Sequence, residues 1–243
     1  MRLLERSGFV TLLSFALIRA CLGAGNMAQT MQMDDAGRVG KVWLDQLEWR
    51  SAQPNEAAWQ AEGWYGDDYN KAWLRSEGDA TSSRTQDARA ELFWDHIVAR
   101  WWSLEAGARE DFGVGPARGW AALGVRGLAP LGVAVEATVY AGGAARSAAR
   151  LKIEYELLFT QRLLLQSEFE MNLYGNADPA RDVSAGLSDL EVGLRLRYEV
   201  RREVAPYAGV VWAKRRGASG DFLNVAGADA NEVRIVVGVR LWL

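Results

Sequence analysis

Apolar and polar residues alternate along most of the chain from Leu44 onward, in short segments separated by Gly, Asp, Asn, Ser and Pro. A period of two predicts β-strands, because successive side chains of a strand point to opposite faces. The clearest segment is Leu151–Phe159, where Lys152, Glu154 and Glu156 fall between apolar residues. Segments 163–173 and 190–200 also carry their charges on one face only. The pattern therefore predicts an all-β chain with one apolar and one charged face.

About twelve such strands fit the sequence, an even number as in bacterial outer-membrane barrels. In one of them, Ala205–Ala213, either the odd-numbered set with Tyr207 or the even-numbered set with Trp212 could lie on the apolar face. The expected strands are Leu44–Arg50, Ala57–Tyr65, Tyr69–Glu77, Gln86–Trp94, Val98–Arg109, Pro116–Leu128, Leu131–Tyr140, Leu151–Phe159, Leu163–Leu173, Leu190–Val200, Ala205–Ala213 and Glu232–Leu243.

The links between these strands alternate in length. Short links at Thr160–Arg162 and Arg201–Glu203 alternate with longer polar links at 174–188 and 217–231. Outer-membrane barrels alternate short periplasmic turns with long external loops in the same way. A soluble sandwich would also show period-two strands, but the dense charges on the second face favour an enclosed lumen. We therefore predict an antiparallel transmembrane β-barrel of the bacterial outer membrane.

Residues 1–24 predict a secretory signal peptide. The basic residues Arg2 and Arg6 lie before the apolar run Gly8–Ile18. Small residues follow this run around Ala24. A lipoprotein site at Cys21 is the alternative interpretation. No later stretch is long and apolar enough for a membrane-spanning helix, so a chain that enters lipid must close as a barrel to satisfy its backbone. We expect a short flexible periplasmic arm at 25–42 and the barrel at 43–243.

The composition narrows the class of function. The net charge is −3, without a basic stripe, and this argues against nucleic acid as a partner. Cys21 is the single cysteine, so the mature chain is not expected to use cysteine chemistry. The chain has eleven tryptophans, a residue that barrels concentrate at the lipid headgroups. We predict such membrane anchors at Trp49, Trp59, Trp64, Trp73, Trp94, Trp101, Trp102, Trp212 and Trp242.

Six segments resemble the copper-resistance protein B family, the CopB or PcoB outer-membrane proteins. They are LDQLEWR (44–50), RGWAALGV (118–125), EYELLFTQRL (154–163), NLYG (172–175), GLSDLEVGLRLRYE (186–199) and RREVAPY (201–207). The resemblance implies an outer-membrane protein of copper resistance that binds copper ions or mediates their passage. It also implies outer-membrane lipids as surroundings and a periplasmic multicopper oxidase as a partner.

The resemblance also directs attention to the N-terminal arm. Family members typically carry an extension rich in Met, His and Asp, and here the arm retains Met27, Met31 and Met33. Thioether sulfur prefers Cu(I), and imidazole also accepts Cu(II). A three-thioether Cu(I) site stands against the simpler interpretation that methionines in a polar tail bind nothing. His96, the single histidine, is expected in a periplasmic turn, either as a copper ligand or as a solvated side chain.

The charged faces of the strands predict a lumen lined by both signs of charge. One interpretation is a cation path along the Glu-rich strands, since carboxylate rings select cations. The other is an ionic plug, since opposite charges on neighbouring strands stabilise each other and a small barrel has a narrow bore. The expected lumen charges are Glu48, Arg50, Arg89, Glu91, Glu154, Glu156, Glu168, Glu170, Glu191, Arg195 and Arg197.

Three functions follow from these observations. The first is a non-enzymatic barrel that binds or conducts copper ions in resistance. The second is a general small porin or structural barrel without copper specificity. The third is a barrel hydrolase, which the single histidine supports poorly, because such enzymes place histidine beside an acid or a serine.

Overall fold

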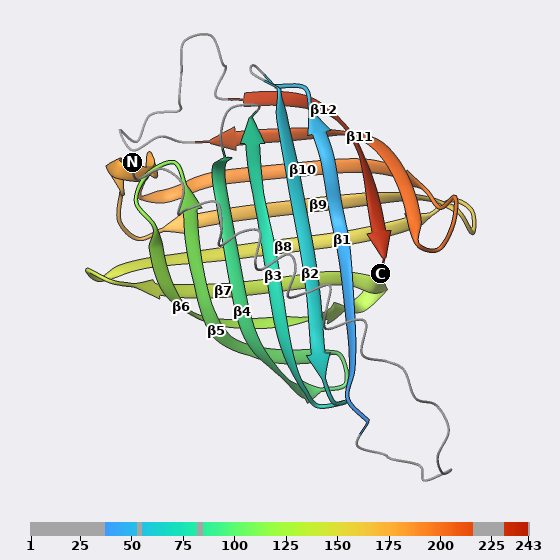
Figure 1. The fold of residues 1–243 in the computed structure, drawn as a ribbon, viewed down its shortest axis with the longest axis horizontal. Helices are drawn as coiled ribbons and strands as arrows, with labels where there is room; N and C mark the ends of the chain where they lie inside the picture. Colours follow the sequence, from blue (N-terminus) through green and yellow to red (C-terminus); the bar gives the residue numbers. More distant parts are fainter. Residues whose placement is uncertain (1–36, 53–54, 82–84, 216–230, 243) are drawn as a thin grey trace, which may run out of the picture. The chain divides into compact units, whose positions relative to one another are not determined.

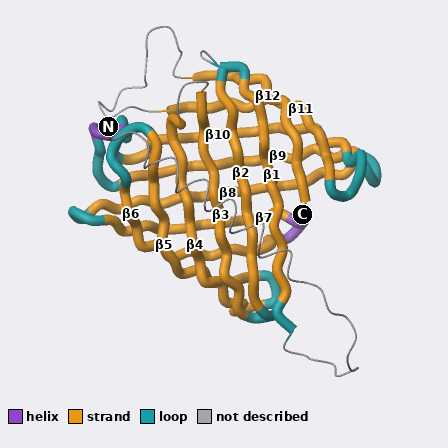
Figure 2. Tube along the Cα trace, viewed as in Figure 1, coloured by secondary structure: helices purple, strands orange, loops and turns teal. Residues whose placement is uncertain are grey.

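The computed structural model describes residues 37–52, 55–81, 85–215 and 231–242. Within them, the strands form one closed antiparallel barrel, in which each strand pairs with its neighbours in sequence and β12 pairs with β1 (Figure 1). The strands form the wall, and the links join them at its two ends (Figure 2). The strands are β1 (Val39–Arg50), β2 (Glu56–Gly66), β3 (Asn70–Thr81), β4 (Thr85–Ala99), β5 (Trp102–Gly113), β6 (Arg118–Ala129), β7 (Val133–Gly142), β8 (Arg146–Leu158), β9 (Leu163–Tyr174), β10 (Gly186–Tyr198), β11 (Val204–Arg215) and β12 (Asn231–Trp242).

The all-β barrel that the alternation predicts is confirmed, with twelve strands among the described residues. Some boundaries differ by several residues. β1 begins at Val39 rather than Leu44, so it includes residues 39–42 that the sequence assigns to the arm. β10 begins at Gly186 rather than Leu190. The strands extend beyond the segments in which apolar and polar residues alternate, because backbone pairing continues there. Val39 pairs with Gly66, and Gly186 pairs with Tyr174.

The two faces of the wall differ sharply in polarity. On β10, Leu194 and Leu196 are exposed, whereas Arg195 and Arg197 are each 1% exposed. On β11, Tyr207 is buried and Val210 is exposed, so the odd-numbered set of this strand faces the lumen. An apolar outer face is what lipid requires, because a charge facing lipid at mid-depth costs about 2–4 kcal/mol.

The two ends of the barrel carry different links. Because the number of antiparallel strands is even, β1 begins and β12 ends at the same end, which we call the terminal end. The short links predicted at Thr160–Arg162 and Arg201–Glu203 lie at this end. The opposite end, the loop end, carries the link 175–185 with the 3-10 turn η2 (Pro179–Arg181). A second 3-10 turn, η1 (Pro130–Gly132), lies at the terminal end. No helix of the described residues is long and apolar enough to cross a membrane.

Candidate functional site

The charged side chains expected in the lumen lie on the inward face of the strands. Four of them, Glu48, Glu91, Arg195 and Arg197, are at most 2% exposed. The others share the inward parity of their strands. They form ion pairs within the lumen, either with one another or with neighbouring inward charges. The full set is Glu48, Arg50, Arg89, Glu91, Glu154, Glu156, Glu168, Glu170, Glu191, Arg195 and Arg197.

Arg195 lies at the centre of the most buried part of this network. Its Nε and Nη2 donate to Glu48 at 3.0 and 3.2 Å, and its Nη1 donates to Glu168 at 2.6 Å. The Gln46 side-chain amide links Arg195 to Glu168. Its oxygen accepts a hydrogen bond from Arg195 at 3.2 Å, and its nitrogen donates one to Glu168 at 2.8 Å. The Tyr207 hydroxyl donates to Glu48 at 3.1 Å. We call these five side chains the plug.

Local sequence features make room for the plug. The pairing of β1 shifts near Leu44 on both of its edges, and this bulge leaves Asp45 and Gln46 both buried although they are adjacent. Gly209 lies opposite Arg195 in the sheet, and a Cβ there would lie 3.1 Å from the Arg195 Cγ. Gly238 lies opposite both Tyr207 and Glu48, and a Cβ there would lie 2.6 Å from the Tyr207 hydroxyl. These glycines therefore leave space for the two long side chains along the wall.

A second set of ion pairs crosses the lumen between opposite walls. Arg89 on β4 pairs with Glu170 on β9 at 2.9 Å and with Glu77 on β3. Arg150 on β8 pairs with the same two carboxylates, at 2.8 Å for Glu170 and 2.9 Å for Glu77. In the strand order, β4 and β9 are separated by β5, β6, β7 and β8. These contacts therefore bridge the bore rather than follow one wall.

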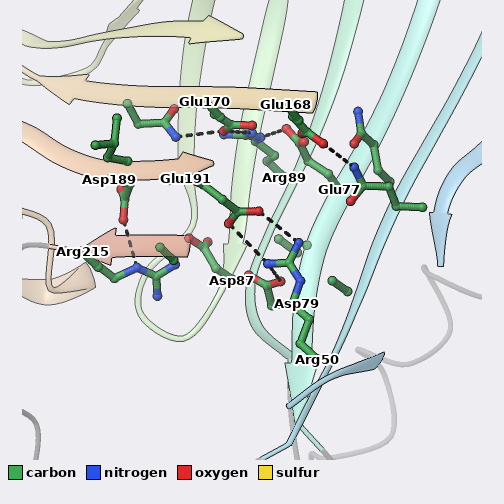
Figure 3. A pocket seen from close by; sticks show the side chains of 18 of the residues that line it. Arg50, Glu77, Asp79, Asp87, Arg89, Glu168, Glu170, Asp189, Glu191 and Arg215 are labelled. Atoms are coloured by element: carbon green, nitrogen blue, oxygen red, sulfur yellow. Dashed lines mark hydrogen bonds and ion pairs between the residues drawn. The ribbon is translucent and has the colours of Figure 1, made fainter. Parts of the chain in front are cut away.

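Two cavities lie on either side of these groups. The cavity at the loop end has a volume of about 270 Å³, and its lining includes Arg50, Asp79, Asp87, Asp189 and Glu191 (Figure 3). In Figure 3, Arg50 reaches Glu191 and Asp79, and Arg215 reaches Asp189. The cavity at the terminal end has a volume of about 340 Å³, and its lining includes Trp73, Arg126, Glu136, Lys152 and Glu154.

The linings of the two cavities meet between β8 and β9. Glu168 lines the cavity at the loop end, and Lys152 lines the cavity at the terminal end. The Lys152 Nζ lies 3.5 Å from Glu168 and 2.7 Å from Glu154. The cavities are thus separated by side chains that are themselves charged and paired.

An acidic wall runs along β8, β9 and β10 between the two cavities. Glu191 lies directly opposite Glu170 in the sheet, and Glu154 lies directly opposite Glu168. Carboxylates in directly facing positions repel each other unless cations lie between them. Here the cations are basic side chains of the same chain. Arg50 pairs with Glu191, Arg195 pairs with Glu168, and Lys152 pairs with Glu154.

Comparison with known proteins assigns the barrel to a family. Residues 38–243 match the family model described as "Copper resistance protein B precursor (CopB)". The chain belongs to this family. A copper resistance protein B homolog of Pseudomonas syringae pv. tomato is 44% identical over 212 residues, which span 87% of this chain and 72% of that protein. The copper resistance protein B of Escherichia coli is 44% identical over 202 residues, which span 83% of this chain and 68% of that protein.

Solved structures agree with the fold of this CopB-family chain. The NanC porin superposes with a TM-score of 0.55 at 14% identity, covering 84% of this chain and 100% of the porin. The KdgM porin superposes with a TM-score of 0.52 at 13% identity, covering 84% of this chain and 98% of the porin. At such identities the likeness shows the fold alone. Fold and family together place the chain in the bacterial outer membrane as a copper-resistance barrel.

His96 does not lie in a turn of this CopB-family barrel, so that prediction is wrong. β4 continues to Ala99, and the link to β5 is only Arg100–Trp101. The alternation runs on through Asp95, which is buried, so His96 falls on the outward face with Trp94. Its ring stacks on Trp94 at 5.5 Å between centroids, and its Nδ1 lies 2.9 Å from the Asn70 Oδ1.

The candidate copper ligands are not brought together by the described residues. No group of three or more His, Cys, Asp or Glu side chains suited to a metal ion occurs in the described part of the chain. Met27, Met31 and Met33 lie outside the described residues. A thioether site on the arm and a role for His96 therefore stay predictions.

The interpretation of the tryptophans as membrane anchors is wrong for part of the set. Trp64 and Trp73 share the inward parity of Glu62 and Arg75, and the two indole rings lie 6.4 Å apart. Trp242 lies beside the inward Arg240, at 5.1 Å. The alternation already contains the signal for this inward orientation, because each of these tryptophans lies two residues from a charged residue on the same face of its strand. Trp49, Trp94 and Trp101 are 47–58% exposed, as anchors should be.

Proposed function

We propose that this copper-resistance barrel is a non-enzymatic path for copper ions, closed at rest by its own cationic side chains. The acidic wall that links the two cavities is the observation that carries the proposal. Directly facing carboxylates at Glu191 and Glu170, and at Glu154 and Glu168, are costly in a sheet unless cations accompany them. A wall of this kind favours cations over anions.

The closed state follows from the contacts across the bore. Arg89 and Arg150 join opposite walls, and Arg195 occupies the space between Glu48 and Glu168. A permanently open pore would need Arg89 and Arg150 to leave these contacts. We infer that a passing copper ion takes the place of a tethered guanidinium or ammonium group at the carboxylates.

The arm and the periplasmic partner complete the proposal. Met27, Met31 and Met33 supply thioethers suited to Cu(I), and they precede β1 in the sequence. The family resemblance supports a periplasmic multicopper oxidase as the protein that acts on the same copper.

Copper entry into vesicles tests the path. The full chain and its variants are reconstituted into liposomes that hold a copper-quenched dye, and the initial rate of quenching is measured. We expect the double variant Glu170→Gln with Glu191→Gln to slow entry about tenfold, which corresponds to a rise of ~1.4 kcal/mol in the activation free energy of entry. Arg195→Gln should accelerate entry, because it removes a tethered cation. Glu110→Gln, at an exposed position of β5, is the matched control and should leave the rate unchanged.

Two results would overturn the path. One is entry no faster than in protein-free vesicles for both the native chain and Arg195→Gln. The other is equal entry for the native chain and the Glu170/Glu191 variant. Calorimetric titration with Cu(I) and Cu(II), with Met27, Met31 and Met33 all changed to Ala, then decides whether the barrel only binds copper. Binding lost in that variant would place the copper site on the arm.

A further inference from the structure

The link between β9 and β10, residues 175–185, leaves its own strands and reaches across the loop end. We call this link the strap. The Asn176 amide donates to the carbonyl oxygen of Ala145 in the β7–β8 link at 3.2 Å. Further along, Arg181 donates to the carbonyl oxygen of Pro116 in the β5–β6 link at 2.9 Å. The strap thus passes over successive strands on one side of the mouth.

Two ion pairs fasten the far part of the strap. Asp178 accepts from the Nε and Nη2 of Arg118, at the start of β6, at 2.8 and 3.2 Å. Arg181 Nη2 donates to Asp87, near the start of β4, at 2.8 Å. In the strand order, β9 and β4 are separated by four strands. The second ion pair therefore joins the two sides of the barrel mouth.

The strap is shaped for this docked position. The backbone of Asp182 turns in the left-handed region at φ 56°, just after η2. Gly115 has φ 96°, and a Cβ there would lie 2.6 Å from the Ala180 carbonyl oxygen, so the β5–β6 link needs a glycine at this contact. On the returning limb, the Ser184 side chain is fully buried.

The strap meets the cavity at the loop end through shared residues. Asp87, which Arg181 holds, lines that cavity, and so do Tyr174 and Asp189 on the strands that flank the strap. Arg118 and Asp178 are not part of the lining. The Asp87 side chain is 60% exposed, whereas the Arg181 side chain is only 8% exposed. Mobile ions therefore have access to the carboxylate of this pair.

We propose that the strap is a lid over the cavity at the loop end, held shut by the ion pairs of Arg181 with Asp87 and of Arg118 with Asp178. An ion pair with an exposed carboxylate, such as Arg181–Asp87, is weak and is screened by salt, so this pair releases first. The Arg118–Asp178 pair is less exposed, at 21% and 15%, and holds the strap more firmly. The role of the lid in copper entry rests on the proposed function, whereas the opening of the lid does not.

Limited trypsin digestion in detergent tests the opening without any copper. Cleavage after Arg181 is followed by mass spectrometry, and heat-modifiable migration checks that each variant is folded. We expect the native chain to resist cleavage at low salt and to be cut faster as NaCl rises. Asp87→Asn with Asp178→Asn should be cut at least tenfold faster at low salt. Glu232→Gln, a carboxylate at the same end that pairs with Arg234 instead, is the control.

Equal cleavage of the native chain, the control and the double variant would overturn the lid. Copper entry into vesicles then separates the lid from the path. Asp178→Asn leaves the cavity lining intact, and we expect it to speed entry. Entry unchanged in a variant whose strap is cut faster would overturn the role of the lid. No entry in any protein, with the trypsin result intact, would overturn the proposed path and leave a lid that opens.

Discussion

The plug and the strap use the same chemistry, the arginine–carboxylate ion pair, in opposite surroundings. In the plug, Arg195 and Glu48 are 1% and 2% exposed, and each makes several contacts. In the strap, Arg181 binds a carboxylate, Asp87, that is 60% exposed. The plug joins β1, β9, β10 and β11 inside the lumen, whereas the strap joins a link to the rim.

Burial decides what each ion pair can do. A buried charge that loses its partner is left without water or counter-ion, so a buried pair is held firmly once formed. An exposed pair exchanges its partner for water and salt at small cost. The same type of ion pair is therefore a fixed closure in the lumen and a releasable fastening at the mouth.

The largest effect is expected from removing the central guanidinium of the plug. Arg195→Ala leaves Glu48 and Glu168 facing each other in the lumen with fewer counter-charges. We expect the free energy of unfolding to fall by about 3–5 kcal/mol, as for other broken buried pairs. Urea titration of the folded protein in lipid or detergent measures it.

Arg215→Ala is the control for this variant, because Arg215 pairs with Asp189 and its side chain is 60% exposed. The control should lower the free energy of unfolding by less than about 1 kcal/mol. If both variants lose the same amount, burial does not distinguish the plug from the exposed pairs, and the comparison with the strap fails.

An intermediate effect is expected from a neutral member of the plug. Tyr207→Phe removes one donor to Glu48, which keeps Arg195 and Arg50. The expected loss in unfolding free energy is about 0.5–1.5 kcal/mol, the usual contribution of one hydrogen bond. Tyr155→Phe, on the outward face of β8, is the matched control. A larger loss in Tyr155→Phe than in Tyr207→Phe would contradict the place given to Tyr207 in the plug.

The alternation of the sequence predicts the wall of the barrel and the residues that face its lumen. A strand has only two faces, so once one apolar position of β10 is assigned, its neighbours Arg195 and Arg197 must point inward. The same rule does not decide which face of β11 points inward, because both its odd-numbered and its even-numbered residues are apolar enough to face lipid. Tyr207 enters the plug there only because β11 pairs with β12, whose Gly238 makes room for its ring.

The contacts that close the lumen are beyond a sequence pattern. Arg89 and Glu170 are five strands apart, and their contact depends on the width of the barrel. The bulge near Leu44 adds an inward position that period-two counting cannot supply. The strap is also beyond a sequence pattern. Asp178 and Arg181 are ordinary loop charges in the sequence, and only the fold brings Arg118 and Asp87 beside them.

The smallest effect concerns the pH dependence of the strap. Hydrogen bonds from Arg118 hold the pKa of Asp178 below its ordinary value, and Arg146 adds a second nearby positive charge. A carboxyl group with a lowered pKa contributes to closure above its ordinary pKa, and the contribution disappears as the pH falls through the lowered value. We therefore expect hydrogen exchange at the amides of Arg181 and Val183, which bond to the Asp178 carbonyl oxygen, to keep its protection from pH 8 down to pH 5. Protection should fall only below about pH 4. In Asp178→Asn the step due to this carboxyl group should vanish, which leaves the Arg181–Asp87 pair as the remaining fastening. Identical pH profiles for the native chain and Asp178→Asn would show that Asp178 does not fasten the strap.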